Sequence, residues 1–243
     1  MVFPAPLTEK IFKKVSNIVS RYDSLDIELF SPKKLNEIKE ELKSLGFEKW
    51  FISEFVMEGY GNVRNMGIVG GALYGADNLI LLDDDEIVVD KDYIQKATEY
   101  AGKRLNGRYI GGVGGYYVDK NGNFLLDESE PWWRILWKKA NSMNRAFSII
   151  KGKERLVDTT FVFGGNMVIN KILYSKVPFD PYNTRGEDID FLLNAKYFGF
   201  DFPLDRELKI VHLPPERKAS PIFKIRQDII RSVSYTHLTL PTN

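Results

Sequence analysis

Residues Asn78–Asp90 read NLILLDDDEIVVD, and the rest of the chain is interpreted outward from this stretch. Four apolar residues, 79–82, run directly into the acidic residues 83–86. A short, continuous apolar run is typical of a strand that is buried on both faces of a sheet. Acidic side chains do not follow such a strand into a core, because burying unpaired carboxylates costs too much free energy. We therefore expect them at the carboxyl end of the strand, where open α/β sheets bind ligands.

The acidic residues Asp83, Asp84, Asp85 and Glu86 have two interpretations. Clustered carboxylates repel one another, and a divalent cation would relieve the repulsion and bridge to a nucleotide diphosphate. The alternative is a solvated acidic turn in front of a helix that Asp90 caps. The buried strand makes the two interpretations about equally good, and two later stretches favour the first.

The composition is that of a globular α/β protein. Of the 243 residues, 44% are hydrophobic and 28% are charged, which suits one domain with a sizeable core. The net charge of +1 gives no general attraction to nucleic acid. The absence of cysteine excludes disulfides and thiolate metal sites. Because no apolar run approaches the roughly 18 residues of a membrane span, we expect no span in this chain and a location in the cytoplasm or at the inner face of a membrane.

The N-terminal part alternates between helical and strand-like patterns. Apolar residues at helical spacing predict one helix from Thr8 and another from Ser31-Pro32. The apolar runs that we interpret as strands are Asp26–Phe30 and Trp50–Val56, with Met1–Leu7 as the remains of an edge strand. This order of elements predicts a parallel, doubly wound sheet.

Gly59–Ala76 reads GYGNVRNMGIVGGALYGA and predicts a glycine-rich loop that becomes a helix. Its backbone N–H groups and Arg64 can bind a phosphate. Close packing of the helix on a sheet explains the glycines at least as well. A dinucleotide-binding fingerprint does not fit, because it requires G-x-G-x-x-G after the first strand.

Two glycine-containing turns and a tryptophan cluster follow in the second half. The Asn-Gly pair within Asp119–Asn123 predicts a hairpin turn. Thr159–Ile169, TTFVFGGNMVI, predicts two strands joined by a tight bend that brings backbone N–H groups and the Asn166 amide to a ligand. The tryptophan cluster consists of Trp132, Trp133 and Trp137. Its side chains can stack on a sugar or can hold an insertion against the body of the protein, and the sequence supports both interpretations equally.

The last predicted elements carry further polar candidates. In Asn183–Phe191, NTRGEDIDF, the pair Glu187-Asp188 opens a helix, and simple capping explains such carboxylates too. The strand Leu208–His212 ends in a histidine. His212 would emerge beside the acidic residues if both strands run parallel, although a histidine at a strand end is more often structural.

The final residues differ from the rest of the chain. Val233–Asn243, VSYTHLTLPTN, do not continue the amphipathic helix of Ile222–Ile230 and resemble translated sequencing adaptor. We expect residues 1–231 to form one domain, shortened at both ends, and residues 232–243 to be a non-native tail that packs on nothing.

Three stretches occur in a characteristic order: GNVRNMG, then LILLDDDE, then FGGNMVI…RGEDIDF…VHLPP. Together they resemble GT-A fold glycosyltransferases of the family 2 type, over about residues 59–215. The resemblance implies a single α/β, Rossmann-like domain whose mostly parallel central sheet is flanked by helices. It also implies transfer of a hexose from a nucleotide-diphosphate sugar to a hydroxyl of a glycan, a lipid or a small molecule, with Mn2+ or Mg2+ as cofactor.

The resemblance assigns roles to individual residues. Those implied at the nucleotide and its diphosphate are Arg64, Asn65, Asp83 and Asp84, and those implied at the donor sugar and acceptor are Gly164, Gly165 and Asn166. The implied metal ligands are Asp83, Asp85 and His212. Asp188 is the implied base, with Glu187 orienting the acceptor, and the helix N-terminus favours the ionised carboxylate that a base needs.

The sequence departs from the family's pattern at two places, so the identity of the nucleotide is not predicted. The family's first strand is reduced to Met1–Leu7, and Asp26–Phe30 lacks the aspartate pair that commonly ends the second strand. A nucleotide-sugar or glycan-binding module without turnover is the alternative function, because a fold does not fix an activity. A nucleotidyltransferase would need a glycine- and lysine-rich loop near the N-terminus. A phosphatase would need D-x-D-x-[TV] after the first strand. Neither pattern is present.

Overall fold

The structure is a computed structural model that describes residues 1–4, 8–129, 139–183 and 185–214. The described residues form two compact units. Unit 1 consists of Met1–Ala76 and Pro178–Glu187, and unit 2 consists of Asp77–Val177 and residues 188–214. The predictions for Trp132, Trp133, Trp137 and Val233–Asn243 fall outside the described residues and stay predictions.

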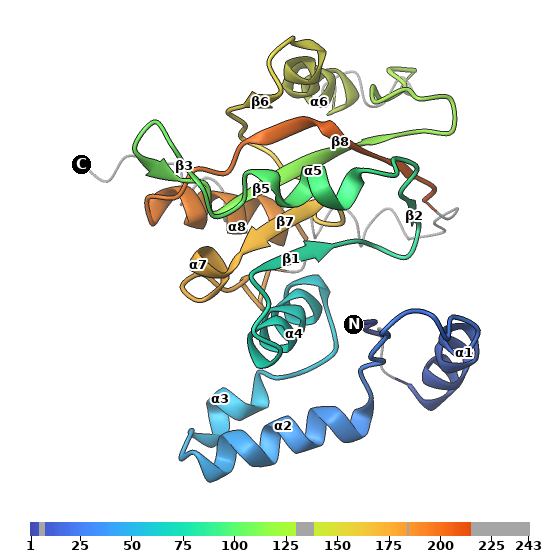
Figure 1. The fold of residues 1–243 in the computed structure, drawn as a ribbon, viewed down its shortest axis with the longest axis vertical. Coiled ribbons are helices and arrows are strands. Elements are labelled where there is room, and N and C mark those ends of the chain that lie inside the picture. Colours follow the sequence, from blue (N-terminus) through green and yellow to red (C-terminus); the bar gives the residue numbers. More distant parts are fainter. Residues whose placement is uncertain (5–7, 130–138, 184, 215–243) are drawn as a thin grey trace. The chain divides into compact units, whose positions relative to one another are not determined.

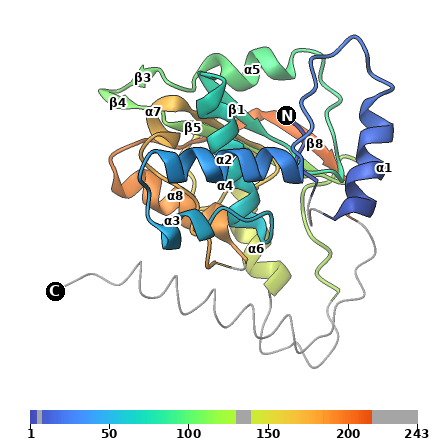
Figure 2. The same ribbon diagram turned by 90° about the horizontal axis from the view of Figure 1, so that it is seen from below.

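Unit 1 is built from helices, which are α1 (Glu9–Val19), α2 (Pro32–Ser44), α3 (Lys49–Ser53) and α4 (Tyr60–Leu73). Thr8 and Ser31 cap α1 and α2, as predicted, by accepting N–H groups of the first turn. The apolar faces of α2 and α4 pack around the fully buried Phe30 (Figure 2). The sequence therefore predicted these two caps and the buried face of α2.

Two strands expected in unit 1 are not formed. Trp50–Val56 is wrong as a strand, because α3 occupies most of it. Phe47, Phe51 and Phe55 recur at the spacing of a helical turn, and their successive rings lie 5.2 and 5.3 Å apart. Asp26–Phe30 is reduced to a single parallel bridge between Leu29 and Val2. The expected glycine-rich loop is also helix, since α4 begins directly after Gly59.

Unit 2 contains a six-stranded sheet flanked by helices, so the predicted α/β class is confirmed (Figure 1). The strand order is β1-β7-β5-β8-β2, and β6 also pairs with β8. The strands are β1 (Asn78–Leu81), β2 (Glu86–Ile87), β5 (Gly112–Val118), β6 (Leu156–Val157), β7 (Met167–Asn170) and β8 (Leu204–His212).

The pairing of these strands is mixed rather than mostly parallel. β5 and β8 run parallel, whereas β1–β7, β5–β7, β2–β8 and β6–β8 are antiparallel. The expected burial of the apolar run 79–82 on both faces is wrong, because β1 lies at one end of the strand order, all its residues are only partly buried, and Leu82 after it is 48% exposed. A continuous apolar run also does not fix the direction of the neighbouring strand, which explains the mixed pairing. Because β1 and β5 are both antiparallel to β7, the strands β1, β5 and β8 share one direction. Their carboxyl ends therefore lie at one edge of the sheet.

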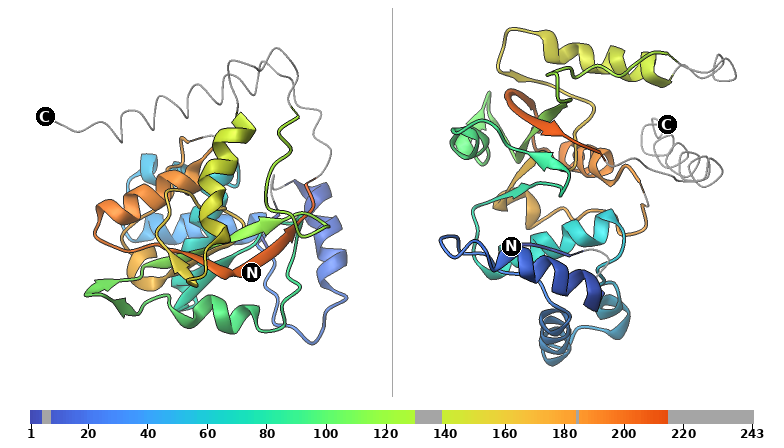
Figure 3. Two further views of the ribbon diagram at one scale, coloured as in Figure 1. Left: turned by 90° about the horizontal axis from the view of Figure 1, so that it is seen from above. Right: turned by 90° about the vertical axis from the view of Figure 1, so that its right-hand side faces the viewer.

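Helices cover both faces of this sheet (Figure 3). On one face α5 (Tyr93–Glu99) packs Tyr93 and Ala97 against Val113 of β5 and its neighbours. On the other face α8 (Glu187–Tyr197) contributes Phe191, whose ring lies 6.3 Å from that of Phe202. The other helical elements of unit 2 are α6 (Lys139–Phe147), the 3-10 helix η2 (Ser148–Lys151) and α7 (Lys171–Tyr174).

A separate hairpin precedes β5. Its strands are β3 (Arg104–Leu105) and β4 (Arg108–Tyr109). The turn residues Asn106 and Gly107 have φ angles of +50° and +83°, as a two-residue hairpin turn requires. Throughout the part of the chain that the structure describes, no helix has the length and apolar character needed to cross a bilayer.

Candidate active site

The acidic residues after β1 converge on one point. Asp83, Asp85 and Glu86 each place one carboxylate oxygen within 4.8 Å of the others. The turn between β1 and β2 is closed by the backbone N–H of Asp83, which donates to Oε2 of Glu86 at 2.8 Å. Asp84 is exposed and lies outside this group of three. Three carboxylates at this spacing can supply oxygen ligands to Mg2+ or Mn2+.

The bend at Gly164-Gly165 lies against these carboxylates. A Cβ atom at Gly165 would lie 2.7 Å from Oδ2 of Asp83 and closer still to Oε1 of Glu86, so a side chain there would displace both carboxylates. The Gly165 N–H donates to the Tyr117 hydroxyl at 3.0 Å, which fixes the bend to β5. The predicted bend and the predicted acidic cluster are therefore parts of one site.

Asn166 supports this bend from inside. Its side chain is fully buried, and Nδ2 donates to the carbonyls of Tyr116 at 3.1 Å and Leu208 at 2.9 Å. Its Oδ1 accepts the hydroxyl of Tyr93 at 2.6 Å. Protein groups therefore use both ends of the Asn166 amide, and the expected contact of Asn166 with a ligand stays a prediction.

Glu86 belongs to the acidic cluster recognised in the sequence, but the resemblance assigned it no role of its own. Burial raises its pKa to about 8, and the negative charges of Asp83 and Asp85 add to the rise. The nearby Tyr117 hydroxyl and the N–H of Asp83 oppose the rise in pKa. Oε1 of Glu86 is buried and makes no hydrogen bond of ordinary geometry with the described residues, although the Tyr117 hydroxyl is close enough to lower the Glu86 pKa. A cation could bind to this oxygen. In the sequence, the signal for this role of Glu86 is its position directly after three aspartates.

The strand β8 brings His212 to the same edge of the sheet. His212 is paired with Glu86 across β8 and β2, and its Nε2 lies 3.4 Å from Oδ2 of Asp85. Its ring stacks on Tyr117 with centroids 4.5 Å apart. His212 thus lies beside Asp85, although it is not one of the three residues whose donor atoms converge.

Asp188 reaches the bend from the start of α8. Its Oδ2 accepts the Gly164 N–H at 3.2 Å, and its Oδ1 accepts the Ile189 N–H at 2.8 Å. Adjacent glycines therefore contact different carboxylates: Gly164 contacts Asp188, and Gly165 contacts the acidic cluster. The bend links a carboxylate at a helix N-terminus to the three carboxylates after β1.

Arg64, Asn65 and Glu187 form a group within unit 1. Arg64 makes an ion pair with Glu187, and both side chains are buried. The Asn65 amide exchanges two hydrogen bonds of 2.8 Å with the backbone of Phe179. These contacts tie α4 to the segment Pro178–Glu187. All three residues therefore have partners within the protein. The resemblance implies instead that Arg64 and Asn65 lie at a nucleotide and that Glu187 lies at the acceptor.

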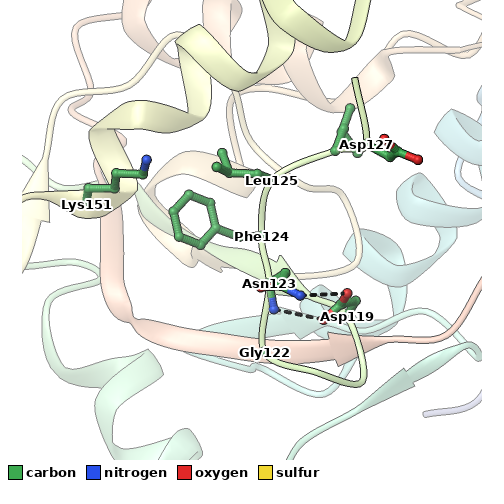
Figure 4. A pocket seen from close by; sticks show the side chains of 8 residues that line it. Asp119, Gly122, Asn123, Phe124, Leu125, Asp127 and Lys151 are labelled. Carbon is green, nitrogen blue, oxygen red and sulfur yellow. Dashed lines mark hydrogen bonds between the residues drawn. The ribbon is translucent and has the colours of Figure 1, made fainter. Parts of the chain in front are cut away.

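A surface hollow of about 400 Å³ lies elsewhere in unit 2, beside the turn after β5. Figure 4 shows Asp119 at its rim with hydrogen bonds from Asn123. This carboxylate also accepts the N–H of Asn121 at 2.8 Å, so it stabilises the predicted turn. The hollow contains none of the expected site residues.

Comparisons with known proteins assign this chain to no family. No protein-family model matches the sequence, and no curated protein matches it. Among solved structures, the mannosyltransferase PcManGT from Pyrobaculum calidifontis, in complex with GDP-Man and Mn2+, matches with a TM-score of 0.47 and 12% identity. The match covers 93% of this chain and 61% of that one, so this chain spans less than two thirds of its length. Similarity at this level does not establish a shared family or activity.

Proposed function

We propose that the protein is a metal-dependent glycosyltransferase that moves a hexose from a nucleotide-diphosphate sugar to an acceptor hydroxyl. One observation carries the proposal: Asp83, Asp85 and Glu86 converge within 4.8 Å at the carboxyl end of β1, against a bend where a side chain would displace two of them. The ordered sequence resemblance to GT-A glycosyltransferases of the family 2 type supports it independently. Neither the acidic cluster nor the resemblance distinguishes between a glycan, a lipid and a small molecule as the acceptor.

The three carboxylates would hold a divalent cation, Mn2+ or Mg2+. The buried Oε1 of Glu86 and the oxygen-rich donor set both fit a hard cation. A nearby imidazole, that of His212, is acceptable to Mn2+ as well. When bound, such a cation offsets the negative charge of a leaving diphosphate.

The other roles fall to residues around the bend. Asp188 would accept the proton of the acceptor hydroxyl while the acceptor oxygen bonds to the anomeric carbon and the bond to the diphosphate breaks. The N–H groups of Gly164 and Ile189 hold its carboxylate in place. Glu187 would act through its ion pair with Arg64, which positions the first residue of α8. His212 would orient Asp85.

Binding of Mn2+ alone tests the central claim. Asp85→Asn keeps the size of the side chain but removes a charged ligand, so Mn2+ affinity should fall by about tenfold or more, as measured by electron paramagnetic resonance of free Mn2+. Asp92→Asn is the matched control, because Asp92 is an exposed aspartate of the same unit outside the acidic group. Equal affinities in the two variants would contradict the proposed metal site.

A second candidate is a nucleotide-sugar or glycan-binding module without turnover. The ion pair between Glu187 and Arg64 favours it, because Glu187, the residue implied to orient the acceptor, already has a partner within the protein. Incubation with a panel of nucleotide sugars and Mn2+ separates the candidates. A transferase releases free nucleoside diphosphate when an acceptor is supplied, whereas a binding module retains its ligand unchanged.

A further inference from the structure

The β3–β4 hairpin and its neighbour Lys176 form a strongly basic edge of unit 2. Residues 103–109 are all exposed and contain three cationic side chains and no acidic one. Lys176 follows α7, and its Nζ lies 5.4 Å from the ring centre of Phe200. Asp201, which follows Phe200 in the chain, connects this region to the hairpin. Its backbone N–H donates to the carbonyl of Tyr109, and its carbonyl accepts the N–H of Gly111. We call the four cations the basic edge; they are Lys103, Arg104, Arg108 and Lys176.

Carboxylates neutralise little of this charge. Arg108 pairs with Asp201 at 3.1 Å on the surface, and Glu99, which pairs with Arg155, also attracts Lys103. Within the described part of the chain, three of the four cations remain without an ion pair, whereas the whole chain carries a net charge of only +1. Lys103 and Arg104 lie over tyrosine rings, at 6.0 and 4.3 Å, and form no ion pair with any residue that the structure describes. Three other lysines of unit 2 are paired with aspartates, namely Lys96 with Asp90, Lys171 with Asp77 and Lys196 with Asp158.

An apolar side chain stands among these cations. Leu105 is 44% exposed and lies directly before the Asn106-Gly107 turn, and the hairpin extends beyond the sheet in Figures 1 and 2. At the surface of an anionic bilayer a leucine can enter the acyl boundary while lysine and arginine reach the phosphates. An acidic peptide or a nucleic acid would use the cations but would offer no comparable environment to the exposed leucine.

The position of the basic edge in the fold agrees with such a surface. The hairpin leads into the amino end of β5, whereas Tyr117, near the carboxyl end of the same strand, contacts the bend of the candidate site. The seven residues of β5 span roughly 20 Å. This is about two and a half Debye lengths at physiological ionic strength. An anionic surface at the hairpin would therefore exert little repulsion on Asp83, Asp85 and Glu86.

We propose that the β3–β4 hairpin binds the surface of a bilayer that contains anionic phospholipids, through the basic edge and Leu105. None of these residues belongs to the candidate active site, so the inference does not depend on the proposed function. Membrane binding through the hairpin leaves the carboxylates at the far end of the sheet, accessible from the solvent.

Sedimentation of the full chain with vesicles tests the proposal. The protein should bind phosphatidylcholine vesicles containing 30 mol% phosphatidylglycerol at low salt, and should not bind vesicles of phosphatidylcholine alone. The triple variant Lys103→Gln, Arg104→Gln and Lys176→Gln should bind on the order of 100-fold more weakly, because each cation near an anionic surface contributes about fivefold. The matched control is Lys10→Gln, Lys14→Gln and Lys49→Gln. It removes the same charge from exposed positions of unit 1 and should change binding by at most about threefold.

A second measurement follows Leu105 directly. Because the chain has no cysteine, Leu105→Cys can carry a single environment-sensitive fluorophore, with Ser20→Cys in the exposed end of α1 as control. Only the label at position 105 should shift to shorter wavelength when anionic vesicles are added. Equal losses in the two triple variants, or a label at position 105 that stays in water, would overturn the proposal. Binding of polyglutamate with no response to vesicles would instead indicate an acidic protein partner.

Discussion

Replacing Gly165 by alanine tests whether the bend and the carboxylates form one site. The added Cβ would lie 2.7 Å from Oδ2 of Asp83 and closer still to Oε1 of Glu86, whereas ordinary contacts begin at 3.4 Å. Asp83 would have to move by about 0.7 Å and Glu86 by more. The φ angle of Gly165 is not in the left-handed region, so alanine adds no backbone strain and the effect is steric.

The displacement should reduce both stability and metal binding. Because the displaced atoms are the ends of two side chains, one of them exposed, we expect the free energy of unfolding to fall by about 1 kcal/mol, the lower end of the cost of overpacking a core. Moving Glu86 also disturbs its hydrogen bond from the Asp83 N–H. Two ligands displaced by most of an ångström no longer meet one cation well, so Mn2+ affinity should fall by roughly tenfold or more.

Chemical denaturation and Mn2+ titration measure the two effects separately. Gly46→Ala is the control, because Gly46 has a φ angle of +84° and open space around it. Alanine at that position should cost about 1 kcal/mol through backbone strain and leave the carboxylates untouched. If Gly165→Ala is destabilised but binds Mn2+ as tightly as Gly46→Ala, the bend and the carboxylates do not form one site.

Two further predictions concern single carboxylates of the candidate site. Because the pKa of Glu86 is about 8 in the folded protein and near 4.5 when unfolded, the folded state retains a proton that the unfolded chain releases. The metal-free protein should therefore lose stability as the pH rises from about 4.5 to 8. In melting curves, Glu86→Gln should abolish this loss of stability. If the melting temperatures of the parent and of Glu86→Gln change with pH in parallel, the prediction is wrong. Asp188→Asn can still accept the Gly164 N–H but cannot serve as a base, so donor binding should persist while transfer falls by roughly two orders of magnitude. Transfer at the parent rate would exclude Asp188 as the base.

The features predicted correctly from the sequence depend on residues that are close together in the chain. Thr8 and Ser31 cap their helices through N–H groups three residues away, and α8 begins at Glu187 as expected. The apolar run before Asp83 forms β1, and the acidic residues follow it. Such patterns are readable because the groups that interact are also neighbours in the sequence.

The errors in the predicted fold also have identifiable causes. Trp50–Val56 was interpreted as a continuous apolar run, although the four-residue spacing of its phenylalanines indicates a helix. The β3–β4 hairpin was missed because its strands have two residues each. Its turn carries an Asn-Gly pair, Asn106-Gly107, so that dipeptide was an available signal. At the similar pair within Asp119–Asn123 the structure forms a turn, but no strand follows within residues 119–129, so the predicted hairpin is wrong there.

One physical requirement separates the site residues that the sequence predicted from those that it missed. Carboxylates held within 4.8 Å repel one another, so the fold must fix them against that repulsion. The charged groups occur as local patterns, but the groups that hold the bend come from distant strands and helices: Tyr117 lies 48 residues from Gly165, and Tyr93 lies 73 residues from Asn166. No spacing rule connects positions that far apart. The sequence could therefore show where charge gathers, whereas only the fold shows that Asn166 holds the bend and that the buried Oε1 atom of Glu86 completes the acidic group.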